Sequence, residues 1–131
     1  MFRSRGTLRY YESWAVVYID PEIAKYYRSQ LPQSLEFNVP KYPPHITVVR
    51  KDREIVLDQS LWNAYGGEVV EFTYEHTVCS DDKYFWLKAY SKRIEEIRIE
   101  LGLPRIRNGF TEFHVTIANT KGLLRTSDQE P

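Results

Sequence analysis

The sequence predicts an α+β domain made of two related halves arranged with pseudo-two-fold symmetry. The first observation is that the pattern His-x-Thr occurs twice, at residues 45–47 and 114–116, each time among β-branched residues that favour strands. The second is that the residues before each copy read strand–helix–strand, with the pattern in the second strand. The spacing between the two histidines equals that between the two threonines, as an internal duplication would produce, although the halves share little other sequence.

The first half begins with an apolar run at residues 14–19, which is typical of a buried strand. Asp20 and Pro21 follow as an N-cap and a proline at the first helical position, so they predict the start of a helix. The helix is expected to end before residues 32–44, a loop with four prolines. This stiff loop leads into a strand at 45–50, which contains the first His-x-Thr pattern.

In the second half, apolar and polar residues alternate as in strands, and turn residues separate the segments. This pattern predicts two strands and a helix before the second His-x-Thr pattern. The second half is predicted to contain a charged connection with one helical turn at 51–67, strands at 68–79 and 84–90, a helix at 92–101 and a strand at 113–120. Ser91 is the expected cap of this helix, and Gly102 with Pro104 ends it.

Both ends of the chain allow two interpretations. Residues 1–13 are rich in arginine and tyrosine, so they form either a solvated arm or a basic, aromatic flap that stacks on a base. Residues 121–131 are polar and form either a disordered tail or a lid. The chain, residues 1–131, is therefore expected to be one domain with its core at about 14–120.

The composition narrows the range of functions. Lys plus Arg and Asp plus Glu each number 18, and this zero net charge argues against binding to long nucleic acid while allowing a small phosphate ligand. Cys79 is the only cysteine, which excludes an internal disulfide and a site of several zinc-bound thiolates. No apolar run is long enough to span a membrane and no signal peptide is evident, so we expect a cytoplasmic protein without membrane partners.

The histidine and the threonine of each His-x-Thr pattern are the expected catalytic residues. Strand side chains alternate between faces, so His45 and Thr47 point to one side, and His114 and Thr116 repeat that arrangement. If the two strands are neighbours, two imidazoles and two hydroxyls line one cleft. Histidine suits general acid–base catalysis near neutral pH, and threonine hydroxyls can donate to phosphate oxygens.

No metal or other cofactor is needed for such a reaction. The histidines, aspartates and glutamates show no zinc-like spacing, so a metal site is not expected. His76, the third histidine, shares an apolar strand face with Phe72 and Tyr74 and is expected to be structural.

The two motifs, at residues 44–48 and 113–117, resemble those of the 2H phosphoesterase family, and the order of elements matches over residues 14–120. The resemblance implies a bilobal, duplicated α+β fold in which antiparallel sheets line a central cleft and the helices lie outside. It also implies metal-independent cleavage or ring opening of nucleotide phosphodiesters.

By match to the family motifs, His45 and His114 would be the acid–base pair, and Thr47 and Thr116 would hold the phosphate. The sequence leaves open which histidine is the acid and which the base. The adjacent 2′-hydroxyl or water would be the nucleophile.

Chain length, motif positions and the aromatic N-terminal stretch are similar to those of the phage anti-CBASS nucleases, which belong to this family. This narrower resemblance implies a hydrolase that cleaves 3′,5′-linked cyclic di- and trinucleotide immune signals in the cytoplasm of an infected bacterium. The expected substrate-binding residues are Tyr11, Trp14, Trp86, Lys88 and Arg107, with Tyr84 and Arg50 as further candidates. Core packing is the competing interpretation for the tryptophans, and solvated surface charge for the arginines.

Two other functions remain open at this stage. The same chemistry could process RNA ends by opening 2′,3′-cyclic phosphates or cleaving 2′,5′ linkages. Alternatively, the chain could be a non-catalytic module that binds and sequesters nucleotides, although two complete motifs favour catalysis.

Overall fold

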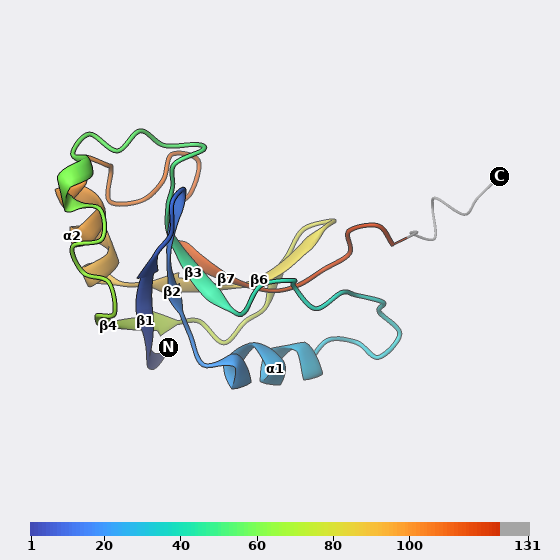
Figure 1. Ribbon diagram of the computed structural model, residues 1–131. Coiled ribbons are helices and arrows are strands. Elements are labelled where there is room, and N and C mark those ends of the chain that lie inside the picture. Colours follow the sequence, from blue (N-terminus) through green and yellow to red (C-terminus); the bar gives the residue numbers. More distant parts are fainter. Residues whose placement is uncertain (124–131) are drawn as a thin grey trace.

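The computed structural model describes residues 1–123 and shows seven strands, two α-helices and one short 3₁₀ helix (Figure 1). The strands are β1 (Phe2–Tyr10), β2 (Trp14–Tyr18), β3 (His45–Arg50), β4 (Val69–Tyr74), β5 (Cys79–Ser80), β6 (Tyr84–Tyr90) and β7 (Phe113–Asn119). The helices are α1 (Pro21–Ser29), α2 (Lys92–Glu100) and the 3₁₀ helix η1 (Gln59–Leu61). The strands predicted at 45–50 and 84–90 are confirmed with their boundaries, and both predicted helices are present.

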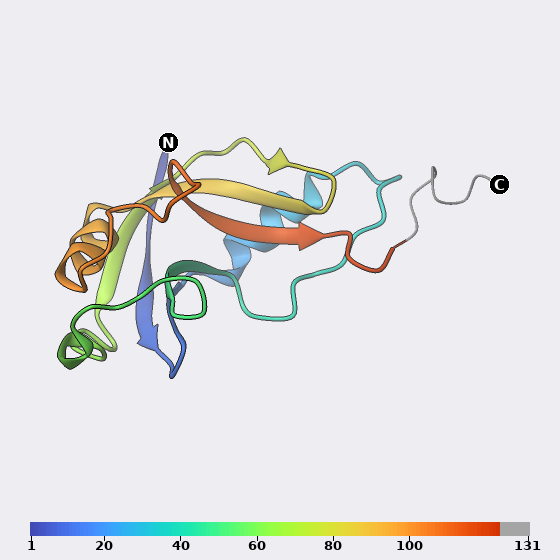
Figure 2. The same ribbon diagram turned by 90° about the horizontal axis from the view of Figure 1, so that it is seen from above.

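The strands form one antiparallel sheet in the order β4-β1-β2-β3-β7-β6-β5, and β4 also pairs with β6. The pairs Thr73↔Tyr90 and Tyr74↔Ala89 close six of the strands into a barrel, to which β5 adds at β6. Strand β1 crosses the direction of β6 and β7 steeply (Figure 2), as expected when a closed sheet twists and coils.

The predicted bilobal, duplicated α+β fold is therefore wrong. The molecule is mostly β-structure, with two helices of nine residues each, and its strands form one closed ring rather than two sheets around a cleft. The main physical reason is β1, which pairs with β2 along one edge and with β4 along the other. Residues 2–10 are thus neither a solvated arm nor a flap, and they connect the strands of the two sequence halves.

β1 can occupy this place because its side chains alternate. Arg3, Arg5 and Arg9 face one side, whereas Gly6 and Leu8 are buried on the other. Gly6 is required by close packing, since a Cβ atom there would lie 2.2 Å from the carbonyl oxygen of Tyr18.

Each helix begins at the predicted cap. Asp20 accepts a hydrogen bond from the backbone N–H of Glu22 at the start of α1. Ser91 Oγ accepts from the Ile94 N–H at 3.2 Å and donates to the Glu71 carbonyl oxygen at 2.8 Å, which joins α2 to β4. Each helix thus supplies its own cap, and the Ser91 hydroxyl also fixes α2 against the sheet.

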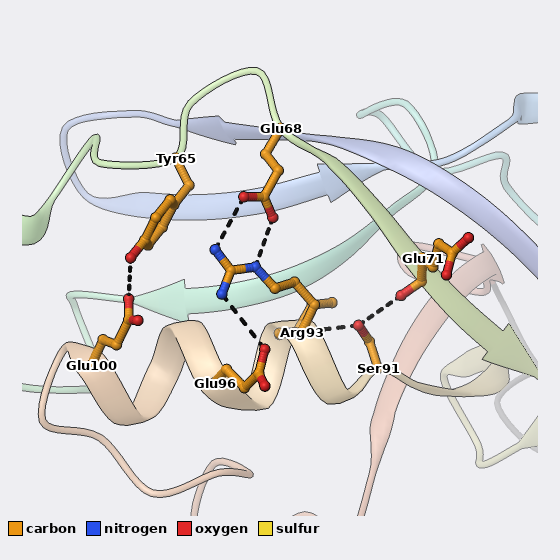
Figure 3. Close-up of polar contacts among 8 residues, drawn as sticks. Tyr65, Glu68, Glu71, Ser91, Arg93, Glu96 and Glu100 are labelled. Atoms are coloured by element: carbon orange, nitrogen blue, oxygen red, sulfur yellow. Dashed lines mark hydrogen bonds and ion pairs between the residues drawn. The ribbon is translucent and has the colours of Figure 1, made fainter.

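Arg93 extends from α2 toward the residue just before β4 and makes a second link between these elements (Figure 3). Arg93 donates two hydrogen bonds to the carboxylate of Glu68 and lies 3.6 Å from Glu96. This pair is about one-third exposed, so its contribution to stability is expected to be small.

The hydrophobic core determines which face of the central strands is available for function. Ile46, Val48, Val115 and Ile117 are buried in the core cluster together with residues of both helices. The alternating residues of β3 and β7 therefore point to the opposite side, which we call the histidine face. No helix within residues 1–123 has the length and apolar character needed to cross a bilayer.

Candidate active site

The two His-x-Thr motifs lie on adjacent antiparallel strands, because β3 pairs with β7 at Ile46↔Val115. In an antiparallel pair, this register places His45 opposite Thr116 and Thr47 opposite His114. All four side chains lie on the histidine face, and each is half-buried. Each imidazole therefore has the hydroxyl of the other motif as its cross-strand neighbour.

His45 is held by the chain just before β3. Its Nδ1 lies 2.8 Å from the Pro43 carbonyl oxygen and, as the protonated ring nitrogen, donates to it. Nε2 of the neutral ring is then free to accept a proton. Burial lowers the pKa of His45, and the bond to Pro43 acts in the opposite direction.

Four aromatic side chains lie together next to His45, and we call them the aromatic wall: Tyr11, Trp14, Tyr18 and Tyr42. The Trp14 ring meets the imidazole edge-on at 5.4 Å, and Tyr18 lies opposite His45 with its ring at 6.3 Å. Tyr11 stacks on Trp14 at 5.5 Å and shares a 2.7 Å hydrogen bond with the Tyr18 hydroxyl. Burial, followed by this hydrogen bond, raises the pKa of Tyr18 to about 12, so the hydroxyl remains protonated.

Tyr11 and Trp14 are among the residues predicted from the sequence, whereas Tyr18 and Tyr42 are not. Tyr18 could have been found from the strand pattern, since it ends the strand that precedes α1. Tyr42 lies in the proline-rich loop, and its ring contacts Trp14 at 5.7 Å. No local pattern in the sequence indicated that contact.

His114 has different surroundings, because charged side chains and a stacked ring lie around it. Phe110 stacks on the imidazole with the ring centroids 5.6 Å apart, and the Arg107 guanidinium lies 4.3 Å over the Phe110 ring. Burial is the largest cause that lowers the pKa of His114. The positive charges of Arg107 and His45 lower this pKa further, whereas Glu112 opposes them.

A small pocket adjoins His114, and its walls include Thr47, Arg107, Phe110 and Glu112. It therefore brings together side chains from β3, from β7 and from the loop between α2 and β7. Since Arg107 comes from the loop at 103–112, the position of that loop determines the shape of the pocket.

Buried Arg98 fixes this loop. Its Nε donates to the Pro104 carbonyl oxygen at 2.8 Å, and its Nη1 donates to the Val48 carbonyl oxygen at 2.7 Å. Both Nη atoms also bond the carboxylate of Glu54, at 2.7 and 3.1 Å. Arg98 is not among the residues predicted from the sequence, because it lies among the buried residues of α2, where an aliphatic side chain is usual.

The predicted residues of β6 also lie on the histidine face. Trp86 pairs with Thr116, and Lys88 pairs with His114. Lys88 lies 3.6 Å from Glu112, so its charge is partly balanced.

The other sequence candidates lie elsewhere or are already paired. Tyr84 is opposite Asn119, beyond a bulge in β6, and Arg50 is paired with Asp52. His76 follows the end of β4, where it is exposed and contacts the ring of Phe2 at 5.8 Å. The proposed tail or lid at 121–131 falls mostly outside the described residues.

The arrangement as a whole offers two imidazoles that can move protons and two hydroxyls that can donate hydrogen bonds, all on one face of the sheet. Within residues 1–123, no cluster of three or more His, Cys, Asp or Glu side chains is placed to hold a metal ion. None of the protein-family models, curated proteins or solved structures compared with the chain matches it.

Proposed function

We propose that the protein is a metal-independent phosphodiesterase that uses His45 and His114 as its acid–base pair. The observation that carries this proposal is the register of β3 and β7, which sets both imidazoles and both threonines on one face. The resemblance of the motifs to those of the 2H phosphoesterases supports it as well. That support comes from the motifs alone, because the chain does not have the bilobal fold implied by the resemblance.

The reaction proceeds by displacement at phosphorus. One neutral histidine takes the proton of the attacking oxygen, which is either the adjacent 2′-hydroxyl or water, while the new P–O bond forms. The bond to the leaving oxygen breaks, and the other histidine, initially protonated, gives that oxygen a proton. Thr47 and Thr116 donate hydrogen bonds to the nonbridging oxygens, where negative charge develops.

The substrate we propose is a 3′,5′-linked cyclic di- or trinucleotide. The aromatic wall beside His45 offers rings on which a base can stack, and the cations near His114 favour a phosphate. Cleavage of such signals in the bacterial cytoplasm would act against host immunity, as the phage anti-CBASS nucleases do.

The test is a turnover assay in the presence of a chelator. Cyclic dinucleotides with 3′,5′ linkages are incubated with the protein, and the products are identified by mass spectrometry beside RNA ends that carry a 2′,3′-cyclic phosphate. His45→Ala and His114→Ala are each expected to lower turnover by about 10²–10⁴-fold. His76→Ala is the matched control, because this histidine lies off the site.

Three outcomes contradict the proposal in different ways. Intact cyclic dinucleotide with cleaved RNA ends would transfer the function to RNA processing. Tight binding without product would indicate a sequestering module. Full activity of either site variant would remove that histidine from the mechanism.

A further inference from the structure

The arginines near the pocket differ in their partners. Arg98 is bound by Glu54, and Arg50 is paired with Asp52 at 2.8 Å. Arg107 forms no ion pair with any residue among 1–123. It is therefore a half-buried guanidinium without its own carboxylate.

The surroundings of Arg107 disfavour its positive charge relative to water. Burial is the largest cause that lowers its pKa, and the like charges of Arg50, Arg53 and Arg98 lower it further. Only Glu54 acts in the other direction, and its carboxylate already binds Arg98. A bound anion would offset both the lost hydration and the repulsion among the arginines.

The position of Arg107 relates this anion site to the catalytic residues. Its guanidinium lies over the Phe110 ring, and that ring also stacks on His114. Arg107 also lines the pocket that contains Thr47 and His114. An anion held by Arg107 therefore lies beside the phosphate that the threonines and histidines would hold.

We propose that Arg107 forms a separate subsite for a second phosphate of the substrate, next to the phosphate that is cleaved. This inference rests on the proposed function and defines its substrate class as nucleotides with two or more phosphodiester groups. The planar guanidinium can bind two phosphate oxygens at once, and its contact with Phe110 already restricts its orientation. A cyclic dinucleotide carries a second phosphate in its ring, whereas a 2′,3′-cyclic mononucleotide has only one.

Binding at this subsite also affects the catalytic pair. The charge of Arg107 is one of the causes that keep the pKa of His114 low, together with burial and the charge of His45. A phosphate at Arg107 balances that charge, so protonated His114 becomes easier to form when the correct substrate is bound. The second phosphate thus favours one histidine as the proton donor.

The experiment compares Arg107→Gln with Arg105→Gln, a control that removes the same charge from an exposed position in the same loop. Dissociation constants for a cyclic dinucleotide and for a 2′,3′-cyclic mononucleotide are measured by calorimetry under conditions without turnover, and kcat/KM is measured separately. In Arg107→Gln, we expect the affinity for the dinucleotide to fall about 10–100-fold, and that for the mononucleotide to change less than about threefold. Arg107→Lys should restore part of the loss, since it keeps the charge but not the planar fork.

The binding and turnover results separate the two proposals. Weaker dinucleotide binding in Arg107→Gln alone, without turnover by the wild-type protein, would support the subsite and refute the enzymatic function. Equal losses for both ligands would overturn the inference, because Arg107 would then hold the phosphate that is cleaved. An unchanged dinucleotide affinity, or no binding by the wild-type protein, would overturn it as well.

Discussion

Replacing Glu54 by alanine is expected to destabilise the protein strongly. Its partner Arg98 is 1% exposed, and the Glu54 side chain is 8% exposed, so the variant leaves a buried guanidinium without its counter-charge. Removing one member of a buried ion pair costs about 3–5 kcal/mol. Arg98 would keep its bonds to the carbonyl oxygens of Val48 and Pro104, which favours the lower part of that range.

A second loss raises the expected cost. The Glu54 carboxylate also accepts a hydrogen bond from the backbone N–H of Arg50, and a lost bond of this kind costs about 1 kcal/mol. We therefore expect the free energy of unfolding to fall by about 3–4 kcal/mol. Urea denaturation followed by tryptophan fluorescence and by circular dichroism measures this change.

Glu68→Ala is the matched control, because the Arg93–Glu68 pair is also bidentate but is about one-third exposed (Figure 3). It should cost no more than about 1 kcal/mol. The double variant Arg98→Met with Glu54→Leu should recover most of the stability lost in Glu54→Ala, since it leaves no unpaired buried charge. If Glu54→Ala costs as little as Glu68→Ala, the reasoning about burial is refuted.

Four other predictions concern the site and the packing. The pKa values of His45 and His114 are both lowered from 6.5, and the reaction needs one of the two histidines protonated. The value of kcat/KM should therefore fall as the pH rises above 6.5. A pH–rate profile with its maximum above pH 7 would contradict this expectation. Because these pKa values are lower in the folded protein, the unfolded state binds more protons than the folded state below pH 6.5. The free energy of unfolding should therefore decrease as the pH falls through 6.5. Urea titrations that show the same stability across this range would contradict the prediction. Gly6→Ala should lower the free energy of unfolding by about 1–3 kcal/mol, because the added methyl group meets the Tyr18 backbone. Ser91→Ala should lower it by about 1–2 kcal/mol through loss of the α2 cap. Thermal unfolding measures both changes, and an unchanged stability would contradict the contact assigned to that residue.

The secondary structure could be predicted well where helix caps or runs of β-branched residues mark an element. Asp20 with Pro21 and Ser91 marked the starts of both helices, and β-branched runs marked the two motif strands. These signals are local, because each depends on the backbone preferences of a few consecutive residues. The strand predicted at 68–79 was too long, since β4 ends at Tyr74 and the two-residue β5 begins only at Cys79.

The architecture could not be predicted in this way, because it depends on which strands pair. Arg3, Arg5 and Arg9 suggested an exposed arm, yet their spacing of two residues is also that of a strand with one polar face. The barrel is closed by only two residue pairs between β4 and β6, and no local pattern indicates them. The repeated motif suggested a duplicated fold, whereas the strands form one ring.

For the candidate site, the strand pattern predicted which side chains share a face, but not what surrounds them. The aromatic neighbours of His45 come from β2 and from a loop, since Trp14 and Tyr18 lie in β2 and Tyr42 lies in the proline-rich loop. Arg107 and Phe110, near His114, lie in the loop that the bond from Arg98 to Pro104 fixes.

The pairing of β3 with β7 also constrains how the chain can change in length. One inserted or deleted residue within either strand would turn its imidazole toward the apolar interior and bring a branched aliphatic side chain to the surface. Residues 32–34, at the exposed start of the proline-rich segment, do not depend on such alternation and precede the site contacts of Tyr42 and Pro43. Variants with length changes should therefore survive at residues 32–34 and be eliminated from the two strands, in any selection that requires the protein to work.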